Sequence, residues 1–79
     1  MEIHPSARRH GVDVDEILHA VANALVVDDL GEDPDRWLVI GPDSAGNLLE
    51  IVVLIASTAD EIVIHAMPMR AKYRKLLEP

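Results

Sequence analysis

The run LLEIVVLIA, at residues 48–56, constrains the fold more than any other segment, because it is apolar on both faces apart from Glu50. A strand with one face in water alternates apolar and polar residues, so this run predicts a strand that is covered on both faces. Two further β-type runs, residues 37–41 and 62–67, flank it and are joined to it by short turn-forming sequences. We therefore predict a three-stranded antiparallel meander with residues 48–56 at its centre.

The residues before the meander predict helical structure. Residues 1–4 are a candidate edge strand, and residues 5–10 predict a short helical turn that begins at Pro5. The main helix is expected to begin at Asp13, whose side chain can cap it while Glu16 reaches back to complete the cap. Apolar residues then recur at helical spacing and define a buried stripe: Val14, Ile17, Leu18, Val21 and Leu25.

After the meander, Pro68 ends the last strand, and residues 69–77 predict an amphipathic C-terminal helix. Arg70 and Arg74 lie one turn apart and off its apolar stripe, so we expect their joint replacement to cost little stability. The predicted fold class is α+β: an N-terminal helix preceded by a short helical turn, then the meander, then a C-terminal helix. Residues 1–79 form a single domain.

The amino-acid composition indicates in which compartment the protein acts and which classes of function are disfavoured. Cysteine is absent, and no apolar run approaches the roughly 18 residues of a membrane span, so we expect a cytoplasmic protein without membrane contact. Hydrophobic residues make up 49% of the chain, which is enough for a packed core and is not typical of disorder. The net charge of −7, taken as a whole, disfavours binding to nucleic acid.

The charge is unevenly distributed, however. Residues 28–35 hold five acids and no base, whereas residues 70–75 hold four of the seven Lys and Arg residues. Gly31 and Pro34 break regular structure and like charges repel, so residues 28–35 predict a flexible, solvated loop. Both charge runs are explained most simply as solvated surface. The alternative is that the molecule is polarised, with an acidic segment and a basic segment that serve its function.

Standard catalytic and ligand motifs are absent, and the spacing of the four histidines does not suit a metal site. We therefore expect no metal and no cofactor. His65 differs from the other histidines because it lies near the end of a strongly apolar strand. It is either a packed strand residue or a catalytic group, and the sequence leaves both interpretations open.

Three segments, taken together and in order, resemble a known family. They are ARRHGVDVDEILHAV, RWLVIGPDSAGNLLEIVVL and IVIHAMPMRAKYRKLL, which cover nearly the whole chain. They are similar to the helix entry, the first two strands, and the last strand with C-terminal helix of BrnT-type toxins of the RelE/ParE superfamily. The resemblance implies a RelE-like fold and the toxin of a bacterial type II toxin–antitoxin pair. It also implies a cognate antitoxin as partner and mRNA, on or off the ribosome, as substrate.

The activity that the resemblance implies is metal-independent mRNA cleavage. Such cleavage needs a base for the ribose 2′-OH, cations for the phosphorane charge, and an acid for the leaving oxygen. The candidate catalytic residues are His65, as base or acid, with Arg70 and Arg74 as phosphate clamps. The candidate substrate-binding residues are Arg9, Arg36 and Lys72.

The chain departs from the family at two positions, which makes weak or lost activity an alternative. Met67 or Pro68 stands where those toxins tend to carry an arginine, and Tyr73 stands where their last helix carries an acid. A second hypothesis is a non-catalytic interaction module that binds a partner through its sheet. On either hypothesis, a strand that is apolar on both faces predicts a homo-oligomer or a heteromeric complex.

Overall fold

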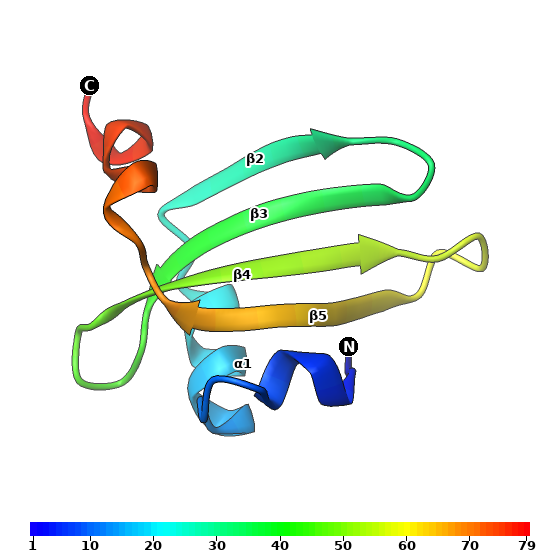
Figure 1. The fold of residues 1–79 in the computed structure, drawn as a ribbon, viewed down its shortest axis with the longest axis horizontal. Helices are drawn as coiled ribbons and strands as arrows, with labels where there is room; N and C mark the ends of the chain where they lie inside the picture. The colour runs from blue at the N-terminus through cyan, green and yellow to red at the C-terminus, as the bar shows by residue number, and fades with distance from the viewer.

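A five-stranded mixed sheet is the framework of the computed structural model, which describes all 79 residues (Figure 1). The strands are β1 (Glu2–Ile3), β2 (Val26–Gly31), β3 (Asp35–Pro42), β4 (Leu48–Ile55) and β5 (Glu61–Pro68). Their order across the sheet is β1-β5-β4-β3-β2, with β1 parallel to β5 and every other pair antiparallel. The apolar run of β4 is therefore the central strand, as its composition predicted.

The predicted three-stranded antiparallel meander, and the RelE-like arrangement built on it, is wrong. Strands β3, β4 and β5 form the expected meander, but β1 and β2 extend it at its two edges. β1 confirms the candidate edge strand at residues 1–4, and its parallel pairing with β5 makes the sheet mixed.

Strand β2 forms where a flexible acidic loop was predicted. Asp28 pairs with Leu38 and Asp29 pairs with Trp37, so the acidic run begins inside the sheet. Like charges are tolerated here because β2 is an edge strand whose side chains are mostly exposed to water. Val26 and Val27, which are poor helix formers, begin the strand and end the helical region sooner than expected.

The helix α1 (Val14–Ala22) confirms the predicted N-terminal helix, with Asp13 at its N-cap position. The predicted reciprocal cap is wrong: Asp13 makes no side-chain cap hydrogen bond. Instead, both carboxylate oxygens of Glu16 accept hydrogen bonds of 2.6 Å from the backbone N–H and the hydroxyl of Ser44, in the β3–β4 turn. These bonds lower the pKa of Glu16 and tie the first turn of the helix to the sheet.

The remaining helices are short and of the 3-10 type. The turn η1 (Pro5–Arg8) confirms the expected helical turn that begins at Pro5. The C-terminal segment η2 (Ala71–Leu77) lies where an amphipathic helix was predicted, but it is a 3-10 helix with Arg70 at its N-cap position. No helix of the molecule is long and apolar enough to cross a membrane.

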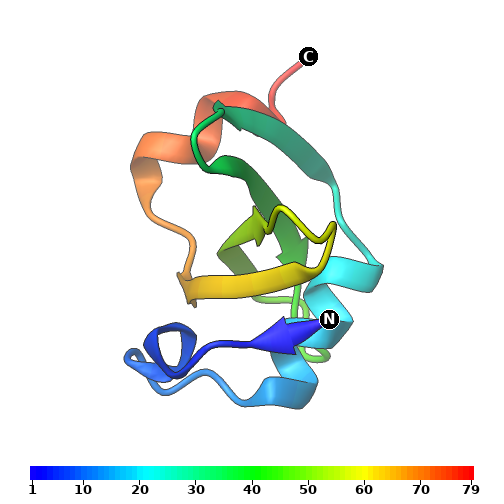
Figure 2. The same cartoon turned by 90° about the vertical axis from the view of Figure 1, so that its right-hand side faces the viewer.

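The helices lie on both sides of the sheet, as Figures 1 and 2 show together: α1 and η1 on one side, η2 on the other. The side chains that form the buried core come from η1, α1, β3, β4 and β5: Ala7, Ile17, Ala20, Val39, Leu49, Ile51, Val53, Val63 and Ala66. On the opposite face of the sheet, Leu38 and Ile40 are also fully buried. Both faces of the central strands therefore carry buried side chains.

Strand β3 and helix α1 approach each other most closely at Gly41. A Cβ atom added to this glycine would lie 2.1 Å from the backbone oxygen of Ala20. Backbone cannot move aside as a flexible side chain can, so only glycine allows the helix to pack at this depth.

We expect Gly41→Ala to lower the free energy of unfolding by about 2–3 kcal/mol, because the added methyl overlaps helix backbone. Urea titration followed by circular dichroism measures this loss. The double variant Gly41→Ala/Ala20→Gly should recover none of it, since the obstructing atom is a carbonyl oxygen and not the Ala20 methyl group. Recovery in the double variant would contradict this account.

Candidate functional site

Glu50 is the only buried charged residue of the chain, and it lies in the central strand β4. Its carboxylate accepts four hydrogen bonds. His65 donates from Nε2 at 3.0 Å, and Arg70 donates from its backbone N–H at 2.8 Å, from Nε at 3.0 Å and from Nη2 at 2.7 Å. Glu50 therefore joins two of the predicted site residues into one cluster, which we call the Glu50 cluster: Glu50, His65 and Arg70.

The charges of this cluster are mutually compensated. Burial works to raise the pKa of Glu50, but the hydrogen bonds from Arg70 and then His65 outweigh it and hold this pKa at about 2. The same bonds raise the pKa of Arg70. Because Glu50 is ionised and can only accept, the proton of a neutral His65 ring lies on Nε2, which leaves Nδ1 unprotonated.

A β-bulge gives His65 its orientation. Val52 pairs with His65 but the next residue, Val53, pairs with Val63, so Ile64 is an extra residue on β5. In a regular strand, His65 would share the core face with Val63; the bulge shifts the alternation and places His65 on the face of Glu50.

The N-terminal segment holds this bulge in place. The Ser6 hydroxyl donates a hydrogen bond of 2.6 Å to the carbonyl of Ile64, and the backbone N–H of His4 donates one of 2.9 Å to Val63. The carbonyl that the bulge leaves without a ladder partner is thereby satisfied. Residues 4–6 are thus part of the support of the site.

A second histidine reaches the cluster from the same N-terminal segment. The ring of His10 lies edge-on to the ring of His65, with 5.7 Å between centroids and 76° between planes. His10 makes no hydrogen bond to another residue and is exposed. Two imidazoles, one held by a carboxylate and one free, therefore lie side by side at the surface.

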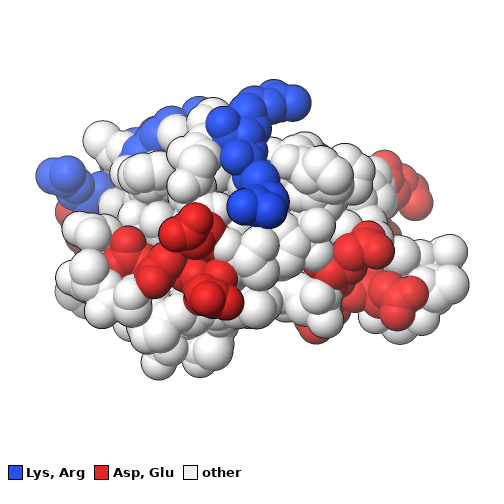
Figure 3. Space-filling view, turned by 90° about the horizontal axis from the view of Figure 1, so that it is seen from below, with Lys and Arg blue, Asp and Glu red and all other residues white.

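Most basic residues of the chain lie in the two segments that contribute His10 and Arg70. Six of the seven Lys and Arg residues lie in two segments that adjoin His65: Arg8, Arg9, Arg70, Lys72, Arg74 and Lys75. Only Arg70 among them pairs with an acid. Figure 3 shows the blue basic side chains gathered along one border of the molecule, with red acidic side chains in separate groups on the remaining, mostly white surface of that face. A molecule of net negative charge thus carries a local region that attracts anions.

His65 and Arg70 are both accessible from solvent. The His65 side chain keeps 27% of its surface exposed, and Arg70 keeps 47%. The Nδ1 atom of His65 makes no hydrogen bond within the chain, and the guanidinium of Arg70 lies 5.8 Å from the centroid of the Tyr73 ring. Each group is held by Glu50, and an aromatic ring lies beside each of them: His10 beside His65, and Tyr73 beside Arg70.

The other predicted site residues make no hydrogen bond to Glu50. Lys72 lies over the ring of Tyr73, at 5.0 Å from its centroid, and Arg9 is exposed at the end of η1. Arg74 is exposed on η2, where residues are rotated by about 120° each, so it does not stack on Arg70 as in an α-helix.

Arg36 lies away from the cluster. It stands four positions before Ile40, the strand partner of Glu50, which corresponds to about 13 Å along β3. Its guanidinium donates instead to the carbonyls of Pro34 and Leu30, at 3.3 and 3.4 Å.

Sequence reasoning did not select Glu50 or His10. The signal for Glu50 was present as the single charge in a strand that is otherwise apolar, since such a charge needs partners. His10 had no such signal, because its contact with His65 depends on how η1 packs on β5.

No group of three or more histidine or carboxylate side chains is placed to hold a metal ion. The site is composed of acid–base and cationic side chains. No known protein family, curated protein or solved structure matches this chain.

The expectation that Arg70 and Arg74 are both dispensable for folding needs correction for Arg70. We expect Arg70→Ala to lower the melting temperature several times more than Arg74→Ala, because it leaves the buried Glu50 carboxylate without its cationic partner. Thermal unfolding at neutral pH compares the two variants, which carry the same change in charge. Equal, small shifts in melting temperature would contradict the importance of the ion pair.

Glu50 also predicts a pH dependence. Its folded-state pKa of about 2, against 4.5 in the unfolded chain, corresponds to roughly 3 kcal/mol of stability. This contribution is present above about pH 4.5 and is lost as the pH falls toward 2. We expect Glu50→Gln to be less stable than wild type at pH 7 and to lose less stability between pH 5 and pH 2. Denaturant titrations measure both, with Glu78→Gln, at an exposed position, as the control that keeps the wild-type profile.

Proposed function

We propose that this protein is a metal-independent endoribonuclease that acts in the cytoplasm as the toxin of a bacterial type II toxin–antitoxin pair. The observation that supports the chemistry best is the Glu50 cluster with the His10 ring against it. The toxin role, and mRNA as the substrate, are supported by the resemblance of three sequence segments to BrnT-type toxins. The chemistry and the biological role therefore have separate support.

In this proposal His65 is the general base. Glu50 holds the proton of the ring on Nε2, so Nδ1 is available to accept the proton of the ribose 2′-OH. The 2′-oxygen then forms a bond to the adjacent phosphorus. Glu50 itself stays ionised and compensates the positive charge that His65 gains, as the buried carboxylate of a catalytic triad does.

Arg70 is the phosphate-binding group. Nε and Nη2 of its guanidinium are fixed on Glu50, so the rotation of the group is restricted, and the half-exposed side chain offers preorganised N–H groups to a phosphate. The unpaired cations Arg74, Lys72 and Arg9 provide a field for the rest of the RNA backbone.

His10, in its protonated form, is the general acid. It gives a proton to the 5′-oxygen as the bond between phosphorus and that oxygen breaks. The products are a 2′,3′-cyclic phosphate on one fragment and a 5′-hydroxyl on the other. His65 gains the proton of the 2′-OH and His10 loses one to the 5′-oxygen, so the step balances, and proton exchange with water restores both rings for the next cycle.

The test is cleavage of a single-stranded RNA by the purified protein in the presence of a chelator. We expect His65→Ala and His10→Ala each to reduce the rate at least about 100-fold, the usual contribution of a positioned acid or base. His19→Ala is the matched control, because His19 bonds the carbonyl of Pro42 and lies outside the cluster. Circular dichroism verifies that each variant is folded.

The nature of the products is a second readout. A cyclic phosphate at the new 3′ end supports attack by the 2′-oxygen, and substrates with a 2′-deoxyribose at the cleaved position should resist. If wild type cleaves no RNA, or if both cluster histidines can be removed without effect, the nuclease proposal is rejected. The interaction module would then be the better hypothesis.

A further inference from the structure

The face of the sheet that carries α1 is only partly covered. The helix has nine residues and is about 13 Å long, whereas the eight residues of β4 span about 26 Å. Figure 1 shows α1 crossing behind one half of the strands, not running along them. The other half of this face lacks a covering helix.

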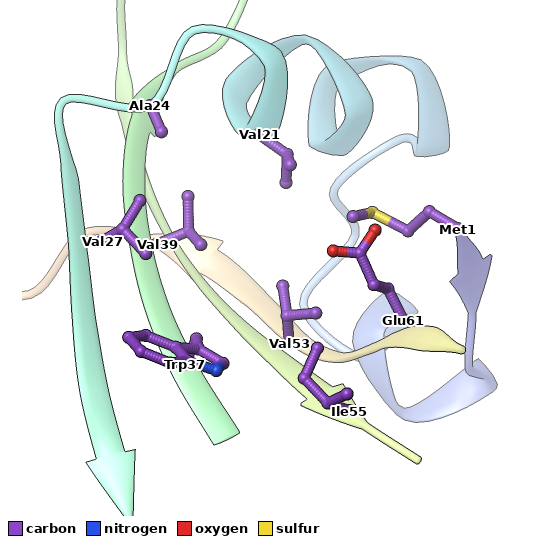
Figure 4. A pocket seen from close by; sticks show the side chains of 9 residues that line it. All are labelled: Met1, Val21, Ala24, Val27, Trp37, Val39, Val53, Ile55 and Glu61. Atoms are coloured by element: carbon purple, nitrogen blue, oxygen red, sulfur yellow. The ribbon is translucent and has the colours of Figure 1, made fainter. Parts of the chain in front are cut away.

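An open apolar groove of about 330 Å³ occupies that half. All but one of its nine lining residues are hydrophobic, and Figure 4 shows them converging from α1, four strands and the N-terminus. The floor is formed by Val27, Trp37, Val53 and Ile55, with Val21 of α1 at one end. Val27 is 61% exposed, which shows that the groove is open to solvent on the side of β2.

The rim of this groove is acidic on two sides. Glu61 lines the groove itself, and Glu2 and Asp60 line the hollow that adjoins it beside Met1. On the opposite side, Asp35 pairs with Ile55 at the end of the groove floor. No lysine or arginine lines the groove or the two hollows beside it.

An apolar groove with an acidic rim favours an occupant that is apolar on one side and basic at its edges. We propose that the groove binds an amphipathic helix of a partner protein, with an apolar stripe that fills the groove and with Lys or Arg residues that meet the acidic rim. A helix fits because it would continue the layer that α1 begins on the same sheet face. The basic residues supply orientation and a faster, salt-dependent association.

A second copy of this chain fits the groove poorly. Face-to-face pairing of two grooves would bring their carboxylates together. In the basic C-terminal segment, residues 69–77, Met69, Tyr73 and Leu77 are half-buried, so Leu76 is its one exposed large apolar side chain that could enter another molecule's groove. The groove is also on the opposite face of the sheet from the Glu50 cluster, so this proposal does not depend on the nuclease proposal.

Trp37 provides a direct readout, because it is the only tryptophan and it lines the groove. The probe is a synthetic helical peptide of roughly 14 residues, with leucine at helical spacing and lysine elsewhere, compared with a peptide in which glutamate replaces every lysine. We expect the lysine peptide to shift Trp37 emission to shorter wavelength and to saturate. The glutamate peptide should produce no shift.

Charge reversal tests the specificity of the rim. Glu61→Lys with Asp60→Lys should weaken binding of the lysine peptide at least about tenfold and allow the glutamate peptide to bind. The control Glu78→Lys reverses an exposed charge in the C-terminal tail, after η2, and should leave the affinity for the lysine peptide close to that of wild type.

Three results would overturn the proposal. The first is an equal response to both peptides, or to neither. The second is a loss of affinity in Glu78→Lys as large as in the rim variant, which would indicate non-specific charge attraction. The third is a Trp37 emission that depends on protein concentration without peptide, which would indicate that a second copy fills the groove. RNA cleavage is measured separately, so failure here is distinguishable from failure of the nuclease proposal.

Discussion

Glu50 has no exposed surface, and the elements around it are arranged so that its charge is paired. An ionised carboxylate in the interior costs several kcal/mol unless it is neutralised and fully hydrogen-bonded. The chain leaving β5 therefore turns back so that Arg70 can offer both its backbone N–H and its guanidinium. No residue of η2 is fully buried, so this segment is held at its N-cap more than by packing of its own.

The same interaction links stability to the proposed chemistry. A surface arginine is free to rotate and a surface imidazole can have its proton on either nitrogen, but the buried carboxylate fixes both. The cluster thus obtains preorganised groups from an interaction that folding already requires. The other face of the sheet is different in character, since its open part is apolar and rimmed by acids. The two proposals, of a nuclease site and of a groove for a basic helix, therefore concern opposite faces of one sheet.

Local patterns predicted the elements better than their assembly. The three meander strands, the start of α1 and the turn at Pro5 follow from periodicity and capping residues, which act over a few neighbours. Strand β2 was missed because aspartate has a low strand propensity. At the edge of the sheet its side chain stays in water, so the strand forms in spite of that propensity. In the site, His65 and Arg70 could be selected from their residue types, but their joining by Glu50 depends on sheet register, which no single segment specifies.

The bulge at Ile64 changes how β5 should tolerate substitution. Before it, the strand contributes Val63 to the core, and after it the core position is Ala66, three residues on and not two or four. In saturation mutagenesis of β5, tolerant and intolerant positions would therefore not alternate with the regular period of two residues that a half-buried strand shows. The spacing between positions that require an apolar residue would be three at the bulge and two elsewhere. An alignment that inserts or deletes one residue there would exchange core positions for site positions along half of the strand.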